Sequence, residues 1–216
     1  MRALGGALTF GVAATSLSGA VSAALAATPS PPSAPHIVVN AAGLGAALLA
    51  GDEAADAMVP VRGSAVLVSC PNVEGVYSDE SWDGASADGA LTYVVAKGGG
   101  VVACLGCAQH GATRTDVGEI EARAILERCA ALVPRLRGCP VVGTWAGLRP
   151  VRTAGLRCER VGETVHCYGN GGSGVVISWG AAREVVRLAG THPGLRPQAL
   201  PAEAHGLPPM RPASRL

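Results

Sequence analysis

The sequence predicts a mixed α/β protein, with short strands in the middle of the chain and helices near both ends. Short apolar runs rich in β-branched residues recur between residues 36 and 108 and are bounded by glycine or proline, as strands are. Apolar residues at helical spacing occur over 116–133 and 179–190. Apolar residues make up 49% of the 216 residues, which is enough for a hydrophobic core.

The first 27 residues allow two interpretations. One is a secretory signal, because a basic residue and an apolar stretch precede small residues ending near Ala26 and Ala27. Hydroxyl residues interrupt that apolar stretch, at Thr9, Thr15, Ser16 and Ser18. The alternative is a strand over ALTFGVAA, a turn at Ser16–Gly19 and a short helix. No run reaches about 18 consecutive apolar residues, so no membrane span is predicted.

The next segments predict a connector and several strands. The Pro/Ser-rich residues 28–35 cannot form a helix or a central strand. His36–Asn40 is a short buried strand followed by a turn at Ala41–Gly45. Val59–Ser69 predicts a pair of strands hinged at Gly63.

A hairpin and a helix follow. Leu91–Ala96 and Val101–Ala108 predict two strands joined by a turn at Lys97–Gly100. Asp116–Val133 predicts the clearest helix, with Asp116 as N-cap and Glu119 completing a capping box.

The remaining elements surround a glycine-rich segment. Pro140–Gly143 begins another strand, and Val165–Tyr168 and Val175–Ser178 are two short apolar runs flanking the glycines. Trp179–Gly190 predicts a helix that ends at its last glycine. Beyond His192 the sequence has no periodicity and is rich in proline.

The composition gives no basis for two classes of partner, and the cysteine pattern predicts reduced thiols. A net charge of +1 and 3% aromatic residues give no basis for nucleic acid or acidic lipid binding. The seven cysteines lie mostly inside apolar runs and are odd in number, which favours buried thiols over a disulfide framework. Cys104, Cys107 and His110 form C-x2-C-x2-H, but a second ligand pair at zinc spacing is missing, so no metal is predicted.

The glycine-rich segment YGNGGSGVVISWG contains G-x-G-x-x-G at Gly169, Gly171 and Gly174. A dinucleotide-binding turn needs a further strand after its helix, and none follows here. A hairpin turn needs one or two glycines, whereas this loop has four in six residues when Gly172 is included. Such a loop favours close approach of the backbone to a bound group, and a flat cofactor ring is a good candidate.

Upstream of that loop, Arg149 lies between Leu148 and Pro150. The proline restricts the backbone before it, so the guanidinium is held in place for bidentate binding of a carboxylate. A structural ion pair is an equally good interpretation of Arg149 from the sequence.

Together, GLRPVR and ETVHCYGNGGSGVVISWGAAREVVRLAG resemble the carboxyl-terminal signature of D-amino acid oxidases and D-aspartate oxidases. The segments HIVVNAAGLGA, VPVRG, LTYVVAKGGGVVACLGCAQ and ARAILERCAALVPRLRG are similar to earlier parts of that family, so the resemblance runs from about Leu8 to Leu188. It implies part of an FAD-binding domain at 1–46 and 140–190, an antiparallel-sheet substrate domain at 47–139, and a flexible tail at 191–216.

On this resemblance the first 27 residues belong to the fold and are not a signal. The family's opening strand and G-x-G-x-x-G turn have no counterpart here, so a truncated chain or a degenerate paralogue is expected. A non-catalytic remnant is the alternative to an enzyme.

The resemblance also implies residue roles. Arg149 binds the substrate carboxylate, Tyr93 donates its hydroxyl to the same group, and Gly172 offers its carbonyl to the substrate amine. Tyr77 is a weaker candidate for a second, mobile active-site tyrosine, because its spacing from Tyr93 exceeds the family's usual spacing. The residues expected to line the flavin or touch FAD are Gly171, Gly172, Ser173, Gly174, Val175, Val176, Ala42 and Ala14.

The implied reaction is hydride transfer from the substrate Cα to FAD, with O2 reduced to hydrogen peroxide and the imino acid hydrolysed to a 2-oxo acid and ammonia. A D-aspartate oxidase is the alternative, with Arg62 or Arg152 as the additional cation.

The final tripeptide Ser214, Arg215 and Leu216 is a variant of S-K-L, which implies recognition by the peroxisomal import receptor. The peroxisomal matrix is therefore the expected location, with the cytoplasm as alternative, and a homodimer is left open.

Overall fold

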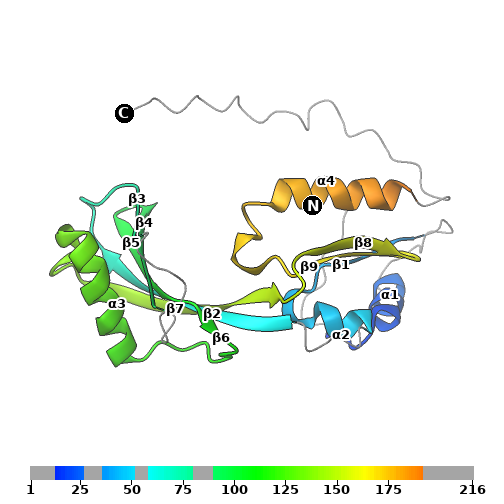
Figure 1. Cartoon of the computed structure of the whole chain (residues 1–216), viewed down its shortest axis with the longest axis horizontal. Coiled ribbons are helices and arrows are strands. Elements are labelled where there is room, and N and C mark those ends of the chain that lie inside the picture. The colour runs from blue at the N-terminus through cyan, green and yellow to red at the C-terminus, as the bar shows by residue number, and fades with distance from the viewer. Residues whose placement is uncertain (1–12, 27–35, 52–57, 80–89, 192–216) are drawn as a thin grey trace, which may run out of the picture.

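The structure is a computed structural model, and it describes residues 13–26, 36–51, 58–79 and 90–191. Within these residues the chain forms a larger antiparallel sheet, a smaller mixed sheet and the helices packed on them (Figure 1). The helices are α1 (Leu17–Ala26), α2 (Ala46–Ala50), α3 (Glu119–Leu132) and α4 (Ser178–Gly190). No helix in the described part is long and apolar enough to cross a membrane.

The larger sheet is antiparallel throughout. Its strands are β2 (Met58–Ser69), β3 (Val76–Ser78), β4 (Ala90–Gly98), β5 (Val101–Cys107), β6 (Gln109–His110) and β7 (Val141–Arg152). Strand β2 pairs with β5 and β6 along one edge and with β7 along the other. The order is therefore β3-β4-β5-β2, with β6 continuing the β5 side and β7 closing the opposite edge.

The smaller sheet contains β1 (Val38–Asn40), β8 (Arg157–Val161) and β9 (Thr164–Tyr168), in the order β1-β9-β8. Strand β1 runs parallel to β9, and β8 is antiparallel to it. The long β2–β7 ribbon runs from the larger sheet toward the smaller one, as Figure 1 shows. Val151, near the end of β7, bridges to Asn170, just after β9.

The main hydrophobic core lies between α3 and one face of the larger sheet. Alternate residues of the strands point toward the helix, including Val66, Val94, Val102 and Cys104, which are fully buried. The helix contributes Ile125 and Cys129, together with partly buried neighbours. Gly106 lets α3 come close, because a Cβ at this position would lie 2.2 Å from Cγ1 of Ile125.

Several predicted elements are confirmed. The hairpin is formed by β4 and β5, the strand at Pro140–Gly143 begins β7, and Val165–Tyr168 lies within β9. The predicted C-terminal helix begins one residue early, at Ser178. The 28–35 connector and the tail from residue 192 lie outside the described residues, as do residues 7–12 of the predicted N-terminal strand ALTFGVAA.

Other predictions are corrected. Val59–Ser69 forms one continuous strand, and Gly63 is not a hinge because it pairs with Gly147 in mid-strand. Helix α3 begins at Glu119 with Gly118 as N-cap, so Asp116 does not cap it and instead offers its backbone carbonyl to Arg62.

Two further local predictions are wrong for related reasons. Residues 17–19 belong to α1 and form no separate turn, since the Ser16 hydroxyl accepts from the Gly19 N–H at the start of the helix. Val175–Ser178 forms no strand, because it turns directly into α4, where the Ile177 N–H bonds the Ser173 carbonyl.

The sequence favours buried thiols for all seven cysteines, and this prediction is wrong for two of them. Cys70 and Cys139 form a disulfide between the end of β2 and the segment before β7. The other five cysteines are free. The predicted boundary at residue 140 does not separate the two sheets: β7 pairs with β2 and so belongs to the larger sheet.

Candidate active site

Trp145, Gly147 and Arg149 of β7 lie on the face of the larger sheet away from α3. These alternate positions pair with Ala65, Gly63 and Val61 of β2. Neighbouring residues along a strand point to opposite faces, and the intervening residues of β2 face α3. The three β7 residues therefore share the face away from α3.

Arg149 reaches across the paired strand. A Cβ built on Gly63 would lie 2.5 Å from both Nη1 and Nη2 of Arg149, so the guanidinium occupies the space above this glycine. Its Nη1 donates to the backbone carbonyl of Cys107 at 3.3 Å. No carboxylate in the described part of the chain pairs with Arg149. The half-buried fork can therefore bind an anionic ligand.

Tyr93 lies on the same face as Arg149. Tyr93 pairs with Leu105, Leu105 pairs with Ala65, and Ala65 pairs with Trp145. These four residues therefore form one row across four strands. The register therefore brings Tyr93 and Arg149 to one surface, as the predicted pairing of their roles requires.

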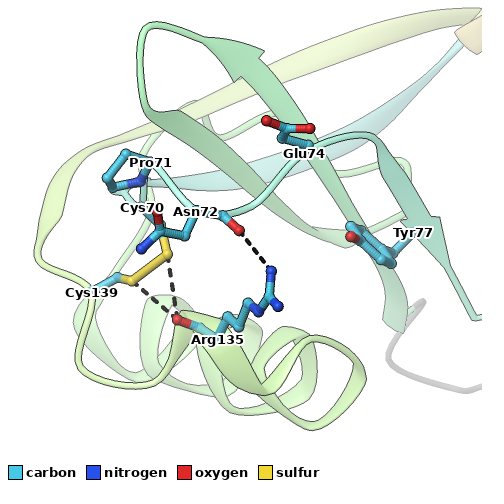
Figure 2. A pocket seen from close by; sticks show the side chains of 7 residues that line it. All are labelled: Cys70, Pro71, Asn72, Glu74, Tyr77, Arg135 and Cys139. Atoms are coloured by element: carbon cyan, nitrogen blue, oxygen red, sulfur yellow. Dashed lines mark hydrogen bonds between the residues drawn. A yellow bond between two sulfur atoms is a disulfide. The ribbon is translucent and has the colours of Figure 1, made fainter.

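Tyr77 lies on the other face. Its register partner is Val94, whose side chain is buried against α3. Tyr77 lines a cavity beside the disulfide, together with Arg135, whose Nη1 donates to the Asn72 carbonyl at 3.1 Å (Figure 2). The structure does not bring Tyr77 together with Arg149, so its position gives the predicted role no support.

The glycine-rich loop approaches Arg149 from the smaller sheet. Gly169 and Gly171 have φ values of 86° and 55°, which side chains rarely adopt. Gly172 follows within the short 3-10 turn η5 (Gly171–Ser173), and a Cβ there would lie 3.3 Å from Cδ of Arg149. The predicted carboxylate-binding and amine-binding residues are thus neighbours.

A cavity of about 500 Å³ lies between this loop, the end of β1 and α4. Ala41 and Gly43 line it on one side, and Gly169, Asn170 and Gly174 on another. The Asn170 Oδ1 atom is buried and has no hydrogen-bond partner in the described residues. This orphaned acceptor at the cavity fits a ligand that carries a donor.

The end of the loop is apolar and open. Val175 and Val176 are 88% and 86% exposed. A flat ring lying on the loop would cover such a surface, so these residues fit the flavin of FAD. Ala42 is exposed between the cavity-lining Ala41 and Gly43, whereas Ala14 is exposed before α1 and contributes nothing to the described lining.

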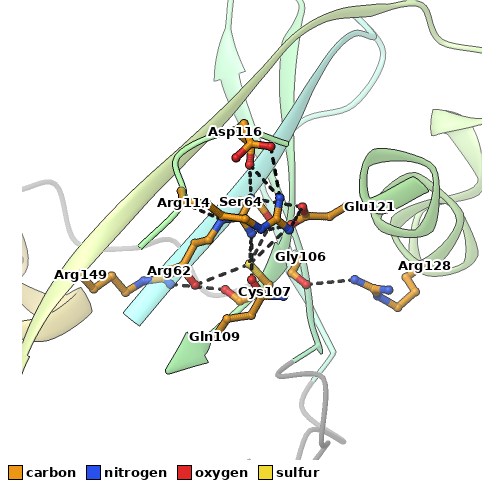
Figure 3. A network of polar contacts seen from close by, with 10 residues as sticks. All are labelled: Arg62, Ser64, Gly106, Cys107, Gln109, Arg114, Asp116, Glu121, Arg128 and Arg149. Carbon is orange, nitrogen blue, oxygen red and sulfur yellow. Dashed lines mark hydrogen bonds and ion pairs between the residues drawn. The ribbon is translucent and has the colours of Figure 1, made fainter. Parts of the chain in front are cut away.

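Arg62 is fully buried on the α3 face of the larger sheet, at the centre of a polar network (Figure 3). Its Nη1 donates to Glu121 at 2.6 Å and to Gln109 at 3.0 Å, and its Nε donates to the Arg114 carbonyl at 3.0 Å. Burial alone would raise the pKa of Glu121, but hydrogen bonds from Arg62, Ser64 and Arg114 outweigh it and hold that pKa at about 2.

Both predicted second cations have partners elsewhere in the described structure. Arg62 is committed to Glu121 on the α3 face. Arg152 lies against Gly169 and donates to the Gly155 carbonyl at 3.2 Å.

The C-x2-C-x2-H residues do not gather. Cys104 is buried in the core with Cys129, and Cys107 bonds Ser64 and Arg62. Within the described ranges no three His, Cys, Asp or Glu residues form a group that could hold a metal ion.

Sequence reasoning missed Trp145, Gly147 and the role of Gly63. The available signal was W-x-G-x-R at residues 145–149, since every second residue of a strand shares a face. Gly63 becomes meaningful only when the β2–β7 register places it under Arg149.

Comparison with known proteins gives a consistent picture. Residues 1–188 match the family described as FAD dependent oxidoreductase. A D-amino-acid oxidase from Rubrobacter xylanophilus is 42% identical over 158 residues, covering 71% of this chain and 46% of the relative. One from Streptomyces coelicolor is 40% identical, covering 71% and 47%. The D-aspartate oxidase of Homo sapiens is 38% identical, covering 70% and 43%.

The fold has counterparts among solved structures. Glycine oxidase from Bacillus cereus superimposes with a TM-score of 0.60 at 21% identity, covering 71% of this chain and 42% of that one. L-proline dehydrogenase from P. horikoshii gives 0.58 at 17% identity, covering 77% and 45%. At these identities the likeness concerns the fold alone. The chain spans less than half the length of the curated relatives named above.

Proposed function

The chain belongs to the family of FAD-dependent oxidoreductases, and on that premise we propose that the protein oxidatively deaminates D-amino acids. The observation that carries the proposal is the position of Arg149, which lies on the sheet face away from α3, beside Gly172, and has no carboxylate partner among the described residues. The names of the relatives supply the D configuration and the amino acid class.

In this proposal the protein binds and orients the substrate. The Arg149 fork holds the carboxylate, and Tyr93, on the same face, donates its hydroxyl to that group. The Gly172 carbonyl accepts a hydrogen bond from the amine. Two substituents of Cα are then fixed, which is the kind of orientation that accelerates a bimolecular step.

Bound FAD supplies the two-electron acceptor, passing electrons to O2 to give hydrogen peroxide, while the imino acid hydrolyses to a 2-oxo acid and ammonia. The residues that would hold the flavin are those of the loop at 171–176, with Ala42 between the cavity-lining Ala41 and Gly43. The exposed Val175 and Val176 and the unpartnered Asn170 Oδ1 support this assignment.

A D-aspartate oxidase activity has less support from the site. Arg62 and Arg152, the two predicted second cations, are engaged elsewhere. Because a D-aspartate oxidase is 38% identical to this chain, D-aspartate is included among the substrates tested below.

The test is a visible absorption spectrum of the purified chain with added FAD, before and after anaerobic D-alanine. Retained flavin that bleaches with D-alanine and not with L-alanine is the expected result. Arg149→Met should retain flavin without bleaching, and Arg152→Met is the matched control. Flavin that stays oxidised with D-alanine and D-aspartate would contradict the proposal, and a folded chain that retains no flavin would favour the non-catalytic alternative.

Peroxisomal import is a separate proposal that rests on the sequence of the last three residues. Ser214, Arg215 and Leu216 lie outside the described residues. Two of the relatives come from bacteria, which have no peroxisomes, so they add no support. A fluorescent fusion with and without the tripeptide, followed in cells that contain peroxisomes, tests it.

A further inference from the structure

Two large side chains converge over a pair of facing glycines on the sheet face away from α3. Gly147 of β7 is opposite Gly63 of β2. A Cβ at Gly147 would lie 2.6 Å from Cη2 and Cζ2 of Trp145, so the indole lies over Gly147. The guanidinium of Arg149 lies over Gly63 in the same way. The indole and the guanidinium therefore cover this pair of glycines, which we call the floor.

The indole of Trp145 is not part of the core. Its residue is 58% exposed, although tryptophan has a large apolar surface. The other tryptophan in the described part, Trp179, is 71% exposed but lies at the start of α4. An aromatic ring held over a glycine beside an anion-binding arginine is a surface on which a ligand can pack.

We propose that Trp145 determines substrate specificity, favouring D-amino acids with large apolar or aromatic side chains. With its carboxylate on Arg149, a substrate packs its side chain against the exposed face of the Trp145 indole. This inference rests on the proposed function, because it requires Arg149 to hold the carboxylate.

The charges around the floor agree with an apolar side chain. The row that holds Trp145 contains Ala65, Leu105 and Tyr93 and carries no charge. The titratable His110 is in register with Val61, which also pairs with Arg149. An acidic side chain would have to turn away from the Trp145 row to reach His110.

The experiment measures binding of three carboxylates to the full chain by calorimetry, with and without FAD. The probes are propanoate, 3-phenylpropanoate and succinate, which match alanine, phenylalanine and aspartate without the amine and so cannot be deaminated. In the unmodified chain, 3-phenylpropanoate should bind about tenfold more tightly than propanoate, the size of one aromatic contact. Succinate should bind more weakly than 3-phenylpropanoate.

Variants test whether Trp145 causes the preference for 3-phenylpropanoate. Trp145→Ala should abolish the preference for 3-phenylpropanoate over propanoate, and Trp145→Phe should keep part of it. Trp179→Ala is the matched control, because it removes an exposed indole outside the floor. As a second readout, 3-phenylpropanoate should change the tryptophan fluorescence of Trp179→Phe but not that of Trp145→Phe.

The outcomes separate the two proposals. An unchanged preference in a folded Trp145→Ala overturns the role of Trp145 while leaving the carboxylate site intact. Tighter binding of succinate than of 3-phenylpropanoate also overturns it and directs attention to His110. If no probe binds the unmodified chain in either condition, the carboxylate site fails, and the proposed function fails with it.

Discussion

The guanidinium of Arg149 occupies the space that a side chain at Gly63 would fill, with both terminal nitrogens 2.5 Å from the position of the missing Cβ. The two residues are not direct register partners, because Arg149 pairs with Val61 and its side chain reaches along the sheet. The direction of the Arg149 guanidinium is thus set by a glycine on the neighbouring strand.

Gly63→Ala should therefore weaken carboxylate binding by displacing the Arg149 fork. Because a charge-assisted hydrogen bond contributes about 1.5–3 kcal/mol, propanoate affinity should fall roughly 10- to 100-fold in a calorimetric titration. Gly143→Ala on the same ribbon is the control, since its added Cβ meets only Leu67 Cδ1 at an ordinary 3.9 Å. Equal losses in both variants would show that the effect belongs to the ribbon as a whole.

Glu121→Gln should destabilise the fold severely at neutral pH. It removes the carboxylate that pairs with Arg62, whose side chain is 0% exposed. Leaving a buried charge without its partner costs about 3–5 kcal/mol, measurable by urea unfolding. Glu159→Gln is the control, because that carboxylate pairs with Arg157 on the surface and is 55% exposed.

The same pair should make stability depend on pH. The pKa of Glu121 is about 2 in the fold, against 4.5 ordinarily. A depressed carboxyl pKa contributes stability that is complete above pH 4.5 and is lost as pH falls toward 2. The contribution of the shift is about 3 kcal/mol. The difference in unfolding free energy between the natural chain and Glu121→Gln should narrow over that window, and a difference that stays constant down to pH 2 would contradict this.

Gly106→Ala should loosen the packing of α3 on the sheet. The added methyl would lie 2.2 Å from Ile125 Cγ1, and overpacking of this kind costs about 1–3 kcal/mol. Ile125→Ala removes the clashing atoms but leaves a cavity costing about 2–5 kcal/mol. The double variant should lose less than the sum of the single losses, because the methyl partly fills the cavity; strict additivity in denaturant unfolding would contradict the contact.

Reduction of the Cys70–Cys139 disulfide should lower the melting temperature. The bond joins residues 69 positions apart, and closing a loop of that length restricts the unfolded chain by up to about 4 kcal/mol. Cys139→Ser should melt at the lower temperature with or without dithiothreitol. Cys158→Ser, which alters a free thiol, should keep the response to the reducing agent.

Elements with a strong local pattern could be predicted from the sequence. The hairpin of β4 and β5 and most of α3 follow from periodicity and turn residues. The role of Arg149 as carboxylate ligand came from the family resemblance and stays a prediction. The predicted cap at Asp116 is wrong because the buried Arg62 takes its carbonyl, a contact between residues 54 positions apart. The local sequence pattern gives no information about a partner so distant in the chain.

Features that depend on strand register could not be read in advance. The local sequence does not show which face of the sheet Tyr93 and Tyr77 occupy. Tyr93 pairs with Leu105 and Tyr77 pairs with Val94, and this register places the two tyrosines on opposite faces. The disulfide was likewise missed, because Cys70 and Cys139 each sit among apolar neighbours and meet only when β7 pairs with β2.

The β2–β7 ladder also limits how this protein can be re-engineered. It carries the small-residue floor along its length, and at one end Val151 is tied to the glycine-rich loop. A chimera with a single crossover between residues 69 and 141 would take β2 from one parent and β7 from the other, so Gly63 and Arg149 would come from different sequences. New side-chain preferences are therefore best sought by point substitution at Trp145, with both strands retained from one parent.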